Sequence, residues 1–144
     1  MNSIILQVRD LRVHYYTRQG PVRAVNDVSF DLYAGERLGL VGESGSGKTT
    51  AAQALMRLIR TPGKIERGEV LLDGLSLLEL PDERMRQIRL AEIALVSQGA
   101  MNSLNPVARV RRQIEDALRD HGVKLGSRER AEWIGELMQR VGLP

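Results

Sequence analysis

The amino-acid sequence predicts an α/β fold with strands in its first half and helices in its last third. Apolar and polar residues alternate over residues 4–16 and 28–32, which is typical of half-buried strands. After residue 106, apolar residues recur at helical spacing instead. Between these regions, the glycine-rich residues 42–47 join an unbroken apolar run to a helical pattern. This order of elements indicates an α/β core with a helical lobe appended.

The composition is that of a globular protein with one ordinary domain. The 144 residues are 42% hydrophobic and 27% charged, a balance that supports a real core. The formal net charge of +3 is too small to indicate nucleic acid as a partner. The chain has no cysteine, which excludes disulfides and thiolate chemistry. No apolar run approaches the roughly 18 residues of a membrane span, so a partner would have to hold the protein at a membrane.

The first strand, over residues 4–16, is expected to be irregular. Its alternation of apolar and polar residues changes phase near Arg9–Asp10. Such a slip predicts a bulge or a break in the strand. A turn at Thr17–Pro21 and a second half-buried strand at Val28–Leu32 follow.

Two apolar runs without alternation are expected to be strands that are covered on both faces, as in a parallel sheet. They are Leu38–Val41 and Ile93–Val96. Between them, the pattern predicts a short strand at Val70–Leu72 and a turn at Asp73–Gly74.

Four helices are expected. One begins at Lys48 and is stopped by Thr61–Gly63, and another is opened by Pro81 and runs to about Leu90. The apolar residues that mark the last two are, respectively, Val107, Val110, Ile114 and Leu118, and Ala131, Ile134, Met138 and Val141.

Residues 42–49, Gly-Glu-Ser-Gly-Ser-Gly-Lys-Thr, match the phosphate-binding pattern G-x-x-x-x-G-K-[ST]. Glycines allow the tight curl in which consecutive backbone N–H groups surround phosphate oxygens. The helix that follows directs its positive dipole end at the same phosphates. Lys48 adds a full charge at the β- and γ-phosphates, and the Thr49 hydroxyl can bind Mg²⁺. The alternative is a glycine-rich turn that fits the pattern by accident, which the flanking strand and helix patterns disfavour.

The predicted site binds ATP and Mg²⁺ through a contiguous set of residues. They are Gly42, Glu43, Ser44, Gly45, Ser46, Gly47, Lys48, Thr49 and Thr50.

The segments around this loop resemble the ATP-binding subunits of ABC transporters. The resemblance rests on Ala24–Phe30, Ala34–Glu36 and Leu40–Thr49. Residues 97–106 and 138–144 are similar to the oligopeptide, dipeptide and nickel importer group of that family. The resemblance implies a P-loop ATPase core with an antiparallel β subdomain, over residues 1–98, and a partial helical subdomain, over residues 99–144.

The resemblance also implies roles for residues outside the loop. Tyr15 matches an aromatic residue that stacks on adenine, although it can also be an ordinary strand residue and Tyr16 is its neighbour. Gln98 matches a glutamine that contacts Mg²⁺ or the attacking water. The resemblance therefore implies that Thr49 and Gln98 bind the metal ion. It also implies that Lys48 and Gln98 are the catalytic residues. Gly99–Ala100 departs from the Asp-Pro of the family, which puts coupling to a membrane partner in doubt.

The resemblance covers about the first half of such a domain. The family continues into a Leu-Ser-Gly-Gly-Gln signature, a strand that ends in Asp-Glu, and a switch histidine, and none of these occurs in the sequence. Weak ATP binding, negligible hydrolysis, exposed apolar faces and poor solubility are therefore expected of this chain alone.

By resemblance, the expected function is that of part of a peptide importer's ATP-binding subunit, at the cytoplasmic face of the membrane. Its expected partners are transmembrane permease subunits and a second ATP-binding subunit. The alternatives are a nucleotide-binding module that does not hydrolyse ATP, a vestigial fragment, and, least favoured by the residues, a small kinase.

Overall fold

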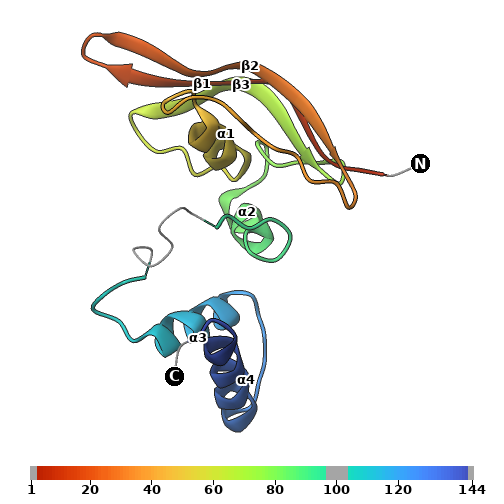
Figure 1. The fold of residues 1–144 in the computed structure, drawn as a ribbon, viewed down its shortest axis with the longest axis vertical. Coiled ribbons are helices and arrows are strands. Elements are labelled where there is room, and N and C mark those ends of the chain that lie inside the picture. Colours follow the sequence, from red (N-terminus) through yellow and green to blue (C-terminus); the bar gives the residue numbers. More distant parts are fainter. Residues whose placement is uncertain (1–2, 97–103, 143–144) are drawn as a thin grey trace. The chain divides into compact units, whose positions relative to one another are not determined.

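The computed structural model describes residues 3–96 and 104–142, which form two compact units (Figure 1). The first unit lies within Met1–Arg89 and contains an antiparallel sheet with two helices. The second lies within Leu90–Pro144 and contains two helices. The predicted α/β class with an antiparallel subdomain and a helical part is confirmed.

The sheet of the first unit has four strands in the spatial order β2-β1-β3-β4, and each neighbouring pair is antiparallel. The elements of this unit are β1 (Ile4–Thr17), β2 (Gly20–Tyr33), α1 (Lys48–Leu55), β3 (Gly63–Leu72), β4 (Leu75–Ser76) and α2 (Asp82–Ile88). Helix α1 contacts β1 and β2 and lies against one face of the sheet (Figure 1).

The irregularity predicted in the first strand is a β-bulge at Asp10. This residue has a φ of 48°, in the left-handed region that aspartate tolerates better than most residues. The pairing of β1 with β2 moves from Val8↔Phe30 to Leu11↔Val28, so β1 advances by one residue more than its partner. Because of this extra residue, Val8 and Leu11 are both fully buried.

The turn predicted at Asp73–Gly74 joins β3 to β4. The two residues have φ values of 46° and 81°, and Leu72 pairs with Leu75 across them. Two positive φ values are what a type I′ hairpin turn requires, and Asp-Gly is a preferred pair for it. The strand predicted at Val70–Leu72 is confirmed and extends back to Gly63.

The prediction of two strands of a parallel sheet is wrong. Neither Leu38–Val41 nor Ile93–Val96 forms a strand, and Val41 and Val96 are 90% and 88% exposed. A strand of a parallel sheet needs a hydrogen-bonded neighbour and cover on both faces. The sheet that the described residues form consists of β2, β1, β3 and β4, and neither segment is part of it.

The predicted helices exist, but the first two end earlier than expected. Helix α1 ends at Leu55 because Arg57 adopts a left-handed φ of 51°. The guanidinium of Arg57 is held by the carbonyl oxygens of Leu77 and Leu80 and by the carboxylate of Asp82. Leu58 and Ile59 therefore lie beyond the helix that was expected to include them. Helix α2 likewise ends before Arg89, whose backbone is extended.

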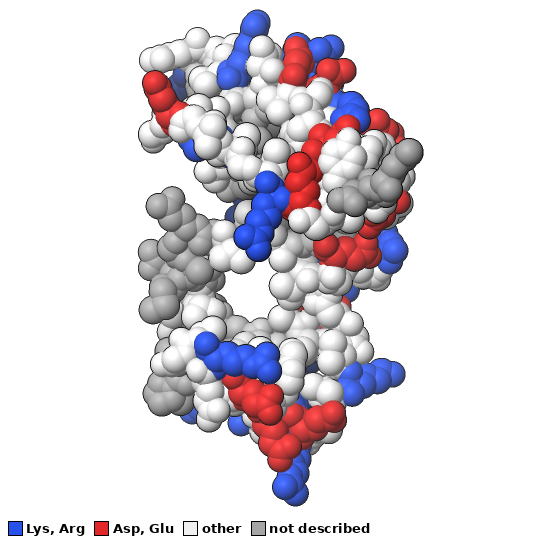
Figure 2. Space-filling model, turned by 45° about the vertical axis from the view of Figure 1, so that its right-hand side comes forward, with Lys and Arg blue, Asp and Glu red and all other residues white. Residues whose placement is uncertain are grey.

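The second unit contains α3 (Val110–Asp120) and α4 (Ser127–Arg140), which contact each other. Val107 and Val141, expected on these helices, lie outside them and are 91% and 71% exposed. Ion pairs one helical turn apart, such as Arg111–Glu115 at 3.0 Å, lie on the helix surfaces. Acidic and basic side chains lie intermixed on the face shown in Figure 2. No described helix is both long and apolar enough to cross a membrane.

The packing predicts that the sheet core, more than its edge, determines stability. Leu11→Ala should lower the free energy of unfolding by about 2–5 kcal/mol, because Leu11 is fully buried and the substitution leaves a cavity. Val22→Ala on β2 should change it by less than about 0.5 kcal/mol, since that side chain is 54% exposed. Urea unfolding followed by circular dichroism measures both, and equal losses would contradict the described core.

Candidate phosphate-binding site

The predicted phosphate loop is a curled segment that ends in α1. Gly45 and Gly47 have φ values of 81° and 91°, which glycine adopts without the steric cost that a side chain brings. The N–H of Ser46 donates to the carbonyl oxygen of Glu43 at 3.2 Å, which closes a turn inside the loop. Helix α1 begins directly afterwards, at Lys48. The loop and the helix start therefore have the local geometry that the sequence pattern predicts.

The end of the loop packs closely on strand β2. A Cβ atom built on Gly47 would lie 2.0 Å from the carbonyl oxygen of Ala24 and 3.8 Å from a methyl group of Val25. Glycine is therefore required at this position for two reasons: its positive φ and the close approach of the Ala24 carbonyl oxygen. The sequence gives no signal for the second reason, because any residue at position 24 supplies a carbonyl oxygen.

The N-terminus of α1 is available to an anion. In the structure no side chain caps it, and its first turn contains no acidic residue. The first N–H groups of a helix carry a partial positive charge and lack acceptors within the helix. Thr49, in this first turn, is exposed, and Thr50 is half-buried. Thr49 is therefore accessible to solvent at the same end of the helix.

The ammonium group of Lys48 is folded over the loop. Its Nζ donates to the carbonyl oxygens of Gly42 and Glu43 at 2.8 and 2.6 Å, and lies 3.3 Å from the hydroxyl of Ser46. These three acceptors are uncharged, so they orient the ammonium without neutralising it. The arrangement concentrates one full positive charge and the helix dipole at the same loop, which suits a small, multiply charged anion.

The two candidate aromatic residues of β1 lie on opposite faces of the sheet. Tyr15 shares its face with buried Val13, and its ring edge is 2.6 Å from the position that a Cβ on Gly63 would take. The hydroxyl of Tyr16 donates to Glu66 at 2.9 Å. This hydrogen bond raises the pKa of Tyr16 and lowers the pKa of Glu66. Tyr16 is thus engaged by a carboxylate on the sheet, whereas Tyr15 packs beside Gly63.

Gln98 and the neighbouring Gly99–Ala100 lie outside the described residues. The structure therefore brings together Gly42–Thr50 but gives no position for the predicted glutamine. In the part of the chain that is described, no group of three His, Asp or Glu side chains could hold a metal ion. Thr49 is the predicted metal-binding residue that the structure places, and a single hydroxyl suits a Mg²⁺ ion that is bound mainly by phosphates and water.

A separate hollow of about 490 Å³ lies along β3. Its lining includes three cations, Arg57, Lys64 and Arg67. Each of these already has a carboxylate partner, in Asp82, Glu66 and Asp27 respectively. Lys48, by contrast with these three cations, is held by uncharged acceptors, which favours the loop over this hollow as the phosphate site.

The chain is similar to known transport proteins over nearly its whole length. The sequence model of a family described as "ABC transporter" matches residues 25–144. The dipeptide transport ATP-binding protein of Lactococcus lactis is 40% identical over 140 residues, which cover 97% of this chain and 40% of that protein. The oligopeptide transport ATP-binding protein of Bacillus subtilis is 40% identical, with 97% and 39% covered. That of Salmonella typhimurium is 45% identical, with 83% and 35% covered. The chain thus spans about 40% or less of the length of these relatives.

The close contact at Gly47 gives a test of the loop geometry. Gly47→Ala should destabilise the first unit by more than twice as much as Gly35→Ala. Both residues have positive φ values, 91° and 77°, and share the left-handed cost of about 1–2 kcal/mol. A Cβ on Gly35 meets nothing within 4 Å, whereas one on Gly47 collides with the Ala24 carbonyl. Unfolding in urea measures the difference, and equal effects would show that the loop does not pack on β2 as described.

Proposed function

The chain belongs to the ABC transporter family, and on that premise we propose that it binds ATP with Mg²⁺ through Gly42–Thr50. The observation that carries the proposal is the position of Lys48. Its ammonium lies over the loop among neutral acceptors, directly beside the open N-terminus of α1. Two sources of positive charge therefore converge on one short, curled segment, as a polyphosphate requires.

The loop residues have distinct roles in this proposal. Backbone N–H groups of the loop and of the first turn of α1 donate to phosphate oxygens. The ammonium of Lys48 exchanges carbonyl acceptors for charged oxygens of the β- and γ-phosphates, which is favourable because charge-assisted hydrogen bonds are the stronger ones. The Thr49 hydroxyl binds the Mg²⁺ ion that neutralises the same oxygens.

Residues outside the loop would complete the nucleotide site. We assign Tyr15, and not Tyr16, to the adenine ring, because the hydroxyl of Tyr16 is already bonded to Glu66 on the other face of β1. Gln98 would contact Mg²⁺ or the attacking water. ATP binding is the activity proposed for this segment, and hydrolysis would depend on further groups.

The names of the similar proteins support a role in transport. Their names describe dipeptide and oligopeptide transport ATP-binding proteins. We propose that this chain is the corresponding part of a peptide importer, at the cytoplasmic face of a membrane. It would act there with transmembrane permease subunits and a second ATP-binding subunit.

Lys48→Ala should lower the affinity for the Mg²⁺ complex of a non-hydrolysable ATP analogue by about 10-fold or more, because a charged hydrogen-bond donor is lost. Isothermal titration calorimetry on the purified chain measures this affinity. The matched control is Lys64→Ala, which removes an ammonium group from a β3 side chain that is 67% exposed. It should leave the affinity within about twofold.

The same two variants decide between the loop and the hollow on β3. Unchanged affinity in Lys48→Ala would refute the proposed site. A loss of affinity in Lys64→Ala alone would indicate that the nucleotide binds in the hollow that Lys64 lines.

Phosphate release tests the restriction to binding. Purified chain incubated with ATP and Mg²⁺ should release phosphate no faster than Lys48→Ala does. Turnover that Lys48→Ala abolishes would show that this chain itself completes the hydrolytic site.

A further inference from the structure

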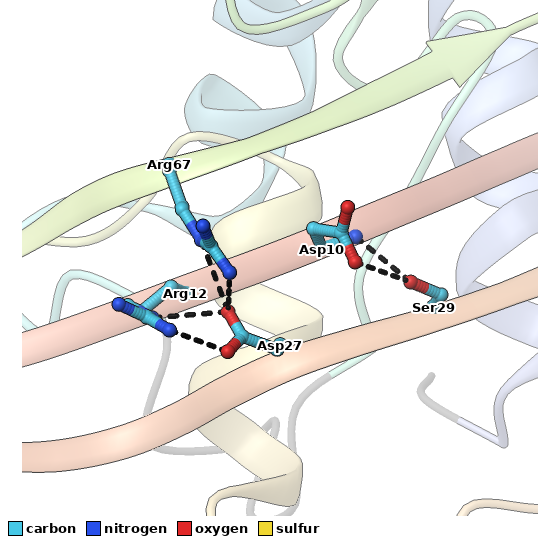
Figure 3. Close-up of polar contacts among 5 residues, drawn as sticks. All are labelled: Asp10, Arg12, Asp27, Ser29 and Arg67. Carbon is cyan, nitrogen blue, oxygen red and sulfur yellow. Dashed lines mark hydrogen bonds and ion pairs between the residues drawn. The ribbon is translucent and has the colours of Figure 1, made fainter.

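One carboxylate ties three strands of the sheet together. Asp27 of β2 accepts hydrogen bonds from the guanidinium of Arg12 on β1 and from that of Arg67 on β3 (Figure 3). Arg12 Nε lies 3.0 Å from Oδ1, and its terminal nitrogen contacts Oδ2. Arg67 reaches Oδ1 with two nitrogens, at 3.1 and 2.8 Å. We call these three residues the Asp27 clamp.

The clamp lies at an irregular point of the strand pairing. The register of β1 with β2 changes between Leu11↔Val28 and Val13↔Val25, where β2 has one extra residue. Asp27 has a left-handed φ of 56° at this bulge. Its side-chain exposure is 33%, and the hydrogen bonds from Arg12 and then Arg67 hold its pKa below the usual value. The carboxylate is therefore ionised at neutral pH, and both ion pairs persist.

The two parts of the proposed nucleotide site lie on the same side of the clamp, along the paired strands β1 and β2. Tyr15 follows Arg12 by three residues on β1, and Ala24 precedes Asp27 by three residues on β2. The carbonyl oxygen of Ala24 is the atom against which Gly47 of the phosphate loop packs. One strand thus carries the proposed adenine contact and the next supports the loop. The Asp27 clamp joins these two strands three residues away from Tyr15 on β1 and three residues away from Ala24 on β2.

We propose that Asp27 is a positioning residue for the nucleotide. Through Arg12 and Arg67 it holds the Tyr15 segment of β1 in register with the β2 segment that supports the phosphate loop. The inference rests on the proposed function, since it concerns the same ligand. A ligand with two linked ends gains affinity when both subsites are held at the right separation in advance. The clamp therefore acts on the combined binding of base and phosphates, and not on either end alone.

The experiment compares two probes on the purified chain. One is the Mg²⁺ complex of a non-hydrolysable ATP analogue, which has both ends, and the other is tripolyphosphate with Mg²⁺, which has the phosphates alone. Asp27→Asn removes the charge but keeps a residue type that tolerates the left-handed backbone. We expect the affinity for the ATP analogue to fall by about 5–20-fold, and that for tripolyphosphate to stay within about twofold.

The matched control is Asp31→Asn. Asp31 pairs with Arg9 at 2.6 Å and so also joins β2 to β1, but on the other side of the Asp10 bulge from Tyr15. This variant should leave both affinities within about twofold. Arg67→Gln provides a milder form of the test, because it removes one arm of the clamp from a side chain that is 55% exposed. It should show the same selective loss if Asp27→Asn fails to fold.

A variant cycle separates positioning from general destabilisation. In a Tyr15→Ala background, Asp27→Asn should have no further effect on the affinity for the ATP analogue, because the adenine end has already been lost. Equal weakening of both probes, a full additional loss in the Tyr15→Ala background, or no loss for the analogue would each overturn the positioning role. If the unaltered chain binds neither probe, the proposed function fails as well, and this result is distinct from the other three.

Discussion

The contact between Gly47 and the carbonyl oxygen of Ala24 connects the phosphate loop to the sheet. A side chain at Gly47 would lie 2.0 Å from that oxygen, so the loop and β2 are in direct backbone contact. The position of Gly47 on β2 determines where Lys48 lies and in which direction α1 extends from the loop. The strand pairing beneath it, with its bulges at Asp10 and beside Asp27, therefore determines where the positive charge of the site is placed.

Much of this arrangement can be predicted from the sequence, where local chemistry decides the structure. The change of phase near Asp10 predicts the bulge, Asp73–Gly74 predicts the hairpin turn, and the glycine pattern before Lys48 predicts the loop. In each case a few neighbouring residues contain the whole signal. Tyr15 is different, because the sequence alone does not distinguish it from its neighbour Tyr16. The structure adds that Tyr16 donates a hydrogen bond to Glu66, which supports the proposal of Tyr15 for the adenine contact.

The features that could not be predicted depend on distant residues. Asp27 lies 15 residues from Arg12 and 40 from Arg67, so three ordinary charged residues become a clamp only when the strands pair. The apolar run Leu38–Val41 indicates a buried strand, but a strand also needs neighbours, and the described residues provide none there. The early end of α1 likewise results from contacts of Arg57 with a later part of the chain. Propensity and periodicity do not contain such information.

We propose that a polyphosphate binds at the junction of the loop and α1. The most direct measurement is the change in backbone amide chemical shifts when the ATP analogue and Mg²⁺ are added to isotopically labelled chain. The largest changes should fall on the amides of Gly45, Gly47 and Thr49, because these would donate to phosphate oxygens. Changes confined to the lining of the hollow on β3, at Gly63 and Gly68, would contradict the claim.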